Sequence, residues 1–297
     1  MIGALHHARL RVADVDEAMR RWSLLLGLSP AGPGRLRCAY EDLALELVPA
    51  GDDEPGLEHV AYELRAGVRL DDVPADGDEV EVPGRGRGLR LTDPDGNGVV
   101  LVERVVPADR TPPVARFTET LPAFHPRRLQ HVNYLTGDVP RLVAWYERIG
   151  LAVTDWIGDE GCWLHADRDH HVLALLDKGF AHVHHLAFEL VDWGELRVAL
   201  DHLGQHRRPV TWGPGRHAMA QNLFAYVRMP EEELFVELFA DMEQLEPDHE
   251  VRRFPDDPHA SNVWGVLPPR TYFRFDAAAV AAERAQLTAL EPGAVGD

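Results

Sequence analysis

The sequence predicts an α+β fold made of tandem βαβββ modules, followed by a C-terminal arm and a helix. Two recurring stretches predict this fold. The stretch LHHARLRVADVDEAMRRWSLLLGL (5–28) resembles LQHVNYLTGDVPRLVAWYERIGL (129–151), and LEHVAYEL (57–64) resembles VHHLAFEL (183–190). Because both pairs recur in the same order, the 297-residue chain contains one structural unit written twice.

Each copy carries the same order of expected elements. An alternating apolar stretch predicts a first strand, and an Asp-Val pair then opens an amphipathic helix that ends at Gly27 or Gly150. The later apolar strand of each copy is again followed by a helix-like stretch, such as DWGELRVALDHL in the second copy. Apolar strands close the two copies, at GVVLVERV (98–105) and LFVELFADM (234–242).

The repeat also predicts how the chain divides. A Pro-rich stretch, VVPADRTPPVARFTETLPAFHP (105–126), separates the copies, and the tail has no counterpart in the first copy. In that tail, EPDHEVRRFPDDPHASNVWGVLPP is expected to be an extended arm and DAAAVAAERAQLTAL (276–290) a helix. We therefore predict an N-terminal module, a linker, a C-terminal module, and an arm with its helix, over residues 1–110, 111–126, 127–245 and 246–297.

Composition narrows the classes of function. Hydrophobic residues make up 45% of the chain and charged residues 27%, which is typical of a globular protein. The net charge of −19 would repel phosphate backbones, so nucleic-acid binding is not expected. The apolar runs are too short for a membrane helix or a signal peptide, so we expect a cytoplasmic protein that binds no membrane. Cys38 and Cys162 are too few for a disulfide framework.

The repeat separates the histidines of AHVHHLAFEL (181–190) into different roles. When the two copies are aligned, His185 occupies the position that corresponds to His59. With a side-chain period of two along a strand, His185 faces away from apolar residues such as Phe188, which are expected to pack against helices. By the same argument His184 shares the helix-packing face, where its role would be structural.

The same period places three ligand-type side chains on the face opposite the helices. His131, His185 and Glu237 come from three different strands of the second copy. A buried carboxylate needs a partner, and a cation is the strongest one. Two imidazoles and one carboxylate, with open coordination positions, suit a divalent first-row metal and the oxygen chemistry of non-heme Fe(II). In a chain with 16 histidines, the residues alone leave open that all three are hydrogen-bonded structural groups.

The first copy keeps only part of this set. His7 and His59 correspond to the two histidines of the second copy, but Val100 stands at the position of Glu237. Two imidazoles without the carboxylate make a poorer site. We therefore expect that the metal site of the N-terminal module has decayed, that its histidines are hydrogen-bonded remnants, and that this module serves as a scaffold.

The repeat and these ligand-type residues together resemble a known protein family. The tandem βαβββ arrangement, with ligands on the first, middle and last strands, is similar to the vicinal oxygen chelate superfamily, whose modules are curved sheets of paired units. The second half resembles the type I extradiol ring-cleavage dioxygenases, and the resemblance covers residues 1–242. The motifs RLQHVNY, the HxxxE strand and the final xEL strand imply the metal ligands His131, His185 and Glu237. The implied metal is Fe(II), with Mn(II) as the alternative.

The resemblance implies three further site residues. The second histidine of DRDHHVLAL is His171, and GPGRHAMAQNLFAYV places His217 nine residues before Tyr226. His171 would take a proton from a catechol, although the residues alone leave His170 open as the active member of the pair. His217 and Tyr226 would hydrogen-bond the substrate oxygen and help to donate a proton. The implied partners are a small aromatic diol and O2, and the implied assembly is a homo-oligomer.

Two positions depart from the family pattern. MPEEELFVEL has no glycine in the turn before the last strand, which puts the loop geometry in question. Ala220 stands where a polar residue is frequent, which suggests altered substrate contacts or proton handling.

Three other functions of such a fold compete with this interpretation. A 2-oxo-acid-type dioxygenase, such as those acting on 4-hydroxyphenylpyruvate, does not need the set His171, His217 and Tyr226. A glyoxalase-like isomerase typically needs a glutamate-rich metal site, against which Val100 counts. A metal-free small-molecule binding protein would leave no reason for three ligand-type side chains to share a face. We therefore predict an extradiol dioxygenase.

Overall fold

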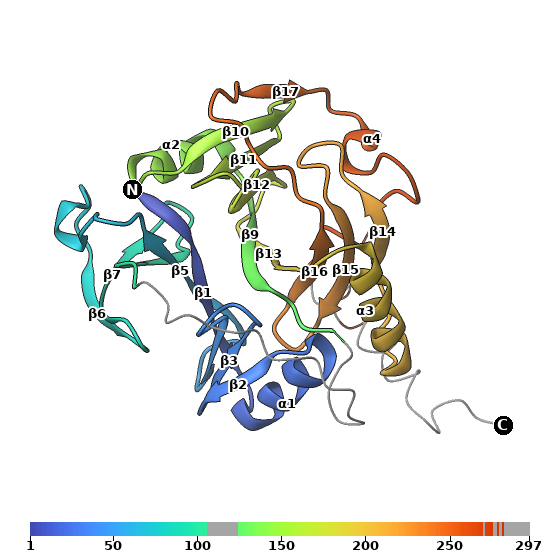
Figure 1. The fold of residues 1–297 in the computed structure, drawn as a ribbon, viewed down its shortest axis with the longest axis horizontal. Helices are drawn as coiled ribbons and strands as arrows, with labels where there is room; N and C mark the ends of the chain where they lie inside the picture. The colour runs from blue at the N-terminus through green and yellow to red at the C-terminus, as the bar shows by residue number, and fades with distance from the viewer. Residues whose placement is uncertain (106–123, 270, 276–277, 279–280, 282–297) are drawn as a thin grey trace.

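The computed structural model describes residues 1–105, 124–269, 271–275, 278 and 281, which are built around two mixed β-sheets (Figure 1). The first sheet has eight strands, in the order β2-β3-β4-β1-β5-β8-β7-β6. Its strands are β1 (Ile2–Val12), β2 (Ser29–Gly32), β3 (Arg35–Arg37), β4 (Leu45–Pro49), β5 (Gly56–Leu64), β6 (Asp78–Val82), β7 (Gly86–Thr92) and β8 (Gly98–Val102).

The second sheet has nine strands, in the order β14-β15-β16-β13-β9-β12-β11-β10-β17. The last of these, β17, belongs to the C-terminal arm and pairs in parallel with β10 at the sheet edge. The strands are β9 (Arg128–Thr136), β10 (Ala152–Ile157), β11 (Gly161–His165), β12 (Leu173–Asp177), β13 (His182–Glu189), β14 (Trp212–Arg216), β15 (Leu223–Met229), β16 (Leu234–Ala240) and β17 (Arg252–Phe254).

Each sheet is assembled from two βαβββ-like units, which confirms the predicted tandem modules; in the unit that begins with β5 a 3₁₀ turn replaces the helix. The first strands of the two units pair antiparallel in the middle of each sheet, β1 with β5 and β9 with β13. Each first strand also pairs in parallel with the last strand of its own unit, as β13 does with β16. The helical segments are α1 (Val15–Leu26), the 3₁₀ turn η1 (Leu70–Asp72), α2 (Val139–Arg148), α3 (Trp193–Gln205) and α4 (Pro258–Ser261).

The Asp-Val pairs of the repeat mark helix starts because the aspartate caps the helix. The carboxylates of Asp14 and Asp138 accept hydrogen bonds, at 2.8 and 3.0 Å, from the backbone N–H three residues later. Helix α1 ends at Gly27, whose φ of 67° is left-handed. After β5 the chain forms only η1 where the repeat predicted a helix, because Pro74 disfavours helical backbone in the residue before it.

A single apolar core connects the helices of the two modules to one face of each sheet. Trp22 of α1 lies against Phe188 of β13, with ring centroids 6.3 Å apart. The Nε2 atom of His202 in α3 lies 2.6 Å from the backbone oxygen of Leu24 in α1, so these two helices are neighbours (Figure 1). Because this core occupies the helix side of the second sheet, the opposite face of that sheet is the one left for a site.

The C-terminal arm crosses the second module as a largely irregular segment that contains β17 and α4 (Figure 1). The helix predicted over residues 276–290 and most of the predicted linker (106–123) lie outside the described residues. Within the described part of the chain, no helix combines the length and the apolar composition that crossing a membrane requires.

A β-bulge interrupts the strand that carries the histidine cluster. In the pairing of β13 with β9, Val183 faces Tyr134 and His185 faces Asn133, so His184 is an extra residue. The prediction that His184 shares the helix-packing face is therefore wrong, because a bulge breaks the two-residue alternation that the prediction assumed. The ring of His184 instead lies in an aromatic cluster on the opposite face.

Candidate metal centre and substrate cavity

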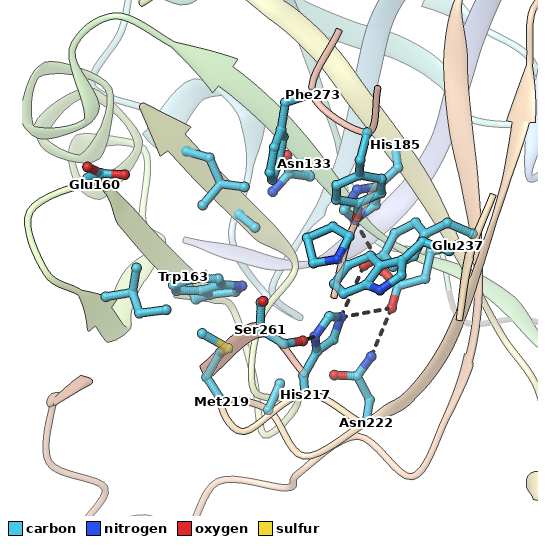
Figure 2. A pocket seen from close by; sticks show the side chains of 18 of the residues that line it. Asn133, Glu160, Trp163, His185, His217, Met219, Asn222, Glu237, Ser261 and Phe273 are labelled. Carbon is cyan, nitrogen blue, oxygen red and sulfur yellow. Dashed lines mark hydrogen bonds and ion pairs between the residues drawn. The ribbon is translucent and has the colours of Figure 1, made fainter. Parts of the chain in front are cut away.

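Three adjacent strands bring the predicted ligands together. His131 lies on β9, His185 on β13 and Glu237 on β16, and these strands are neighbours in the sheet. The Nε2 atoms of the two histidines lie 3.0 and 3.2 Å from Oε2 of Glu237, and 3.3 Å from each other. All three side chains are buried, and Figure 2 shows His185 and Glu237 pointing into the same space.

The residue before His131 determines which of its ring nitrogens carries the proton. Gln130 donates from Nε2 to the backbone oxygen of His171 at 2.7 Å, so its Oε1 is the atom that faces Nδ1 of His131 at 2.6 Å. An amide oxygen only accepts, which assigns the proton of His131 to Nδ1. In its neutral form His131 therefore presents a lone pair on Nε2, the atom next to Glu237.

His184 acts in the same way on His185. The backbone oxygen of Tyr272, in the arm, lies 2.9 Å from Nε2 of His184 and only accepts, so His184 carries its proton there. Burial holds the pKa of His184 well below its ordinary value, so the ring is neutral and its Nδ1 is an acceptor. That Nδ1 is 2.8 Å from Nδ1 of His185. His185 must then donate from Nδ1 and present a lone pair on Nε2.

The outcome is three electron-pair donors that face one another. Burial raises the pKa of Glu237, but His131 and His185 outweigh that effect and hold the pKa well below its usual range, so the carboxylate is ionised. Three converging acceptors repel one another unless a cation lies between them, either a proton on one Nε2 that hydrogen-bonds to Glu237 or a metal ion. Two neutral imidazoles and one carboxylate are a ligand set for first-row divalent metals such as Fe(II) and Mn(II). These residues therefore fit a metal ion.

His171 lies in the loop before β12, with its ring centroid 4.3 Å from that of His131. Behind it, Nε2 of His170 lies 2.7 Å from the carboxylate of Asp155, which Arg252 also contacts at 2.7 Å. Because Asp155 accepts, His170 carries its proton on Nε2, and its Nδ1 accepts from Nδ1 of His171 at 3.0 Å. His171 is thus left with a lone pair on Nε2.

His217 and Tyr226 contact each other close to Glu237. Nδ1 of His217 donates to the backbone oxygen of Ser261, in the arm, so Nε2 is an acceptor for the Tyr226 hydroxyl at 3.1 Å. Nε2 of His217 lies 3.8 Å from Oε1 of Glu237, and Asn222 donates to that same oxygen at 2.9 Å (Figure 2).

These side chains line one end of a cavity of about 510 Å³. Asn133 and Asn222 also line this end, and the Oδ1 atom of each is buried without a hydrogen-bond partner among the described residues. A ligand with hydroxyl groups would satisfy such acceptors. We call this the polar end, and it consists of His131, Asn133, His171, His185, His217, Asn222, Tyr226 and Glu237.

In the first module the histidine that corresponds to His131 is His7, and its proton is on the other ring nitrogen. Arg85 donates from Nε to Nε2 of His6 at 3.0 Å, so His6 carries its proton on Nδ1, 2.7 Å from Nδ1 of His7. His7 is then protonated on Nε2, the atom that a metal would need. Val100 takes the place of the carboxylate. Nδ1 of His7 is hydrogen-bonded as expected, whereas neither ring nitrogen of His59 makes a hydrogen bond in the described part of the chain, and its Nδ1 lies 3.6 Å from Oε1 of Glu58.

Comparison with known proteins agrees with this geometry. Residues 128–236 match the family model described as the Glyoxalase/Bleomycin resistance protein/Dioxygenase superfamily. Metapyrocatechase 2 from Cupriavidus necator is 29% identical over 180 residues, which cover 56% of this chain and 54% of that protein. The chain is thus similar in sequence to metapyrocatechase 2 and in fold to homoprotocatechuate 2,3-dioxygenase. The match spans about half the length of this curated relative.

Solved structures share the fold over most of the chain. Homoprotocatechuate 2,3-dioxygenase from Brevibacterium fuscum, in its anaerobic complex with 3,4-dihydroxyphenylacetate, has a TM-score of 0.77 at 23% identity, covering 92% of this chain and 91% of that one. The enzyme from Arthrobacter globiformis has a TM-score of 0.78 at 22% identity, covering 92% and 90%. The Mn(II)-bound glyoxalase from Novosphingobium aromaticivorans has a TM-score of 0.75 at 23% identity, covering 90% and 91%.

The two positions that depart from the extradiol dioxygenase pattern, the turn before β16 and Ala220, both have residues with left-handed backbone. Glu233, in the turn before β16, has a φ of 55°, a left-handed conformation that glycine adopts more easily. Strands β15 and β16 nevertheless pair in continuous register, with Tyr226 opposite Glu237, so the turn does not displace the ligand. Ala220 has a φ of 60° and lines the cavity.

Sequence reasoning missed the residues that orient the histidines. Gln130, His170 and His184 each stand directly before a site histidine, and that shared position was a signal that could have found them. Asp155 and Arg252 gave no such signal, because their contact depends on where the arm returns to the edge of the sheet.

Proposed function

We propose that the protein is an extradiol dioxygenase, which cleaves the aromatic ring of a catechol with O2 at an Fe(II) ion held by His131, His185 and Glu237. The observation that carries the proposal is the convergence of three lone-pair donors at the polar end of a cavity large enough for an aromatic substrate. When bound there, Fe(II) supplies open coordination positions at which two adjacent substrate oxygens and O2 meet. The sequence relationship to metapyrocatechase 2 supports the same class of reaction.

In this proposal His171 takes a proton from a substrate hydroxyl. Burial lowers the pKa of His171 well below its ordinary value, so the ring is neutral at physiological pH. The pair formed by His170 and Asp155 holds the ring in the tautomer whose Nε2 accepts. Of the two histidines that the sequence left open, His171 lines the cavity, whereas His170 is fully buried behind it.

His217 and Tyr226 bind the substrate oxygen and return a proton to the ring-opened product. Burial raises the pKa of Tyr226 well above its usual value, so its hydroxyl stays protonated and can donate. Nε2 of His217 accepts from that hydroxyl in the structure, and the backbone oxygen of Ser261 holds the ring in place. Oδ1 of Asn133, which lacks a partner among the described residues, can accept from a substrate hydroxyl.

Oxygen uptake tests the proposed reaction. Protein purified without oxygen and reconstituted with Fe(II) is expected to consume O2 with a catechol and to give a yellow ring-opened product. Parallel reconstitution with Mn(II) establishes which ion supports turnover. The absence of O2 uptake with simple, biphenyl-type and amino-acid-derived catechols would overturn the proposal. Metal-dependent turnover that needs no O2 would instead favour a glyoxalase-like isomerase.

Metal analysis tests the ligands separately. Glu237→Ala is expected to lose bound metal, because it removes the carboxylate on which both histidines converge. Val100→Ala is the matched control, since it shortens the side chain at the equivalent position of the first module and is expected to keep the metal. Unchanged metal content in Glu237→Ala would show that the ligand assignment is wrong.

A further inference from the structure

Beyond its polar end, the cavity has walls and a rim that would favour some substituted catechols over others. We infer that the substrate is an uncharged catechol with a second, apolar ring, and that catechols bearing a carboxylate are poor substrates. This inference rests on the proposed function. Three features of the described residues support it: the volume of the cavity, the composition of its outer walls, and the charges at its rim.

The cavity is larger than a single ring requires. Its volume is about 510 Å³, whereas an apolar cavity of about 150 Å³ is enough to hold one benzene molecule. A catechol alone would therefore leave most of the cavity filled with water. A second ring would displace that water from apolar walls, which is the favourable change in hydrophobic binding.

The outer walls are aromatic and aliphatic. Trp212 is fixed by a hydrogen bond of 2.8 Å from its Nε1 to the backbone oxygen of Val266, and its ring stacks on that of Tyr226. Because the only side-chain donor of Trp212 is already bonded to the arm, the part of its ring that lines the cavity is apolar. The apolar wall consists of Ile157, Trp163, Leu176, Trp212, Leu267 and Phe273.

The rim disfavours a negatively charged substituent. Glu160, Asp256 and Asp257 lie there and are exposed. Among the described residues that line the cavity, Lys178 is the one lysine or arginine, and its ammonium is 3.6 Å from Glu160 and 4.8 Å from the ring centre of Phe273. In the view of Figure 2, Trp163 lies between Glu160 and the polar end. A charged substituent of either sign would lose its hydration against the apolar wall, and a carboxylate would in addition face a net acidic rim.

A four-compound panel tests this inference. Specificity constants from O2 uptake are compared for catechol, 3-phenylcatechol, 3,4-dihydroxyphenylacetate and 3,4-dihydroxyphenethylamine. We expect 3-phenylcatechol to exceed each of the others by at least about tenfold, a difference of roughly 1.4 kcal/mol. A preference for the carboxylated or the amine-bearing compound, or equal values for all four, would overturn the inference while leaving the dioxygenase proposal intact. O2 uptake with none of them would count against the dioxygenase proposal itself.

Binding without turnover provides an independent readout. Quenching of tryptophan fluorescence in anaerobic, metal-loaded protein reports the affinity of each compound, because Trp163 and Trp212 line the cavity. The order of affinities is expected to follow the order of specificity constants. If the carboxylated compound binds as tightly as 3-phenylcatechol, the charge argument is wrong even if turnover differs.

A pair of arm variants tests the charge argument directly. Leu267→Lys places a cation at the cavity wall, at a position that is 47% exposed and so tolerates the change. We expect it to lower the preference for 3-phenylcatechol over 3,4-dihydroxyphenylacetate by about tenfold. Val266→Lys is the control, because it adds the same charge one residue away on a side chain that is 68% exposed and does not line the cavity. An equal effect, or no effect, in both variants would contradict the inference.

Discussion

His170 donates its Nε2–H to the carboxylate of Asp155 across 2.7 Å, and neither side chain is exposed to solvent. Arg252, from the C-terminal arm, contacts the same carboxylate at 2.7 Å. Burial raises the pKa of Asp155, but the hydrogen bonds from His170 and Arg252 outweigh it and hold the pKa below its usual value. The arm thus keeps Asp155 ionised, and Asp155 in turn determines the tautomer of His170 and of His171.

Asp155→Asn should end this control of the His170 and His171 tautomers. The amide of asparagine can donate as well as accept, so it no longer fixes the position of the proton on His170. We expect the turnover number to fall by about tenfold to a hundredfold, the usual effect of losing an outer partner of a site histidine. Nitrogen-15 spectra of labelled histidines in metal-free protein report whether the His171 tautomer has changed.

Glu243→Gln is the matched control for that prediction. The carboxylate of Glu243 also pairs with Arg252, at 2.7 Å, but lies 4.0 Å from Nε2 of His170, too far for a hydrogen bond, and the backbone bond from His170 to Glu243 does not involve that carboxylate. The Glu243→Gln variant also loses one negative charge from this cluster, but we expect its nitrogen-15 signals of His171 to be unchanged. Spectra and turnover that are the same in Asp155→Asn as in the native protein would show that Asp155 plays no part in positioning His171.

His184 should set the affinity of the metal site through His185. His184→Phe keeps an aromatic ring in the cluster but removes the acceptor of the Nδ1–H of His185. We expect metal affinity, measured by competition with a chelator, to fall by about tenfold to a hundredfold. His184→Gln should retain most of the affinity, since Gln130 already acts as the acceptor for His131. Equal losses in the two variants would indicate that the change disturbs packing rather than the tautomer.

His6 should make the first module sensitive to acid. Burial, and secondly Arg85, lower the pKa of His6 to about 3. The unfolded chain takes up this proton near pH 6.5, so the free energy of unfolding falls as the pH drops from 6.5 towards 3, by about 1.4 kcal/mol for each pH unit from this one group.

His6→Gln should reduce this acid-induced loss, because glutamine does not titrate and can still accept from Arg85. Between pH 7.5 and 5.5 the loss of unfolding free energy, measured with urea, is expected to be smaller by about 1.4 kcal/mol than in the native protein. His206→Gln, at an exposed position, serves as the control. An identical pH dependence in His6→Gln and the native protein would mean that His6 is not held neutral by the fold.

The fold and the ligand set were predictable because both follow from periodicity. The repeat located the first and last strands, and the two-residue period placed His131, His185 and Glu237 on one face. The same period failed at His184, since one inserted residue changes the face without changing the composition of the strand. The contact of Tyr272 with His184 could not be predicted either, because the arm has no counterpart in the first copy from which to infer its path.

Two features of the first module would each explain the metal site that we expect it to lack. One is the missing carboxylate at Val100, and the other is the donor Arg85, which leaves His7 with a proton on Nε2. Val100→Glu restores only the carboxylate. We expect the metal content to remain that of the native protein, because binding would require His6 and His7 both to change tautomer and would leave Arg85 facing an N–H, at a cost of about 1–3 kcal/mol. Metal analysis at concentrations that just saturate the second module checks this, and one additional ion per chain in Val100→Glu would show that the carboxylate alone was missing.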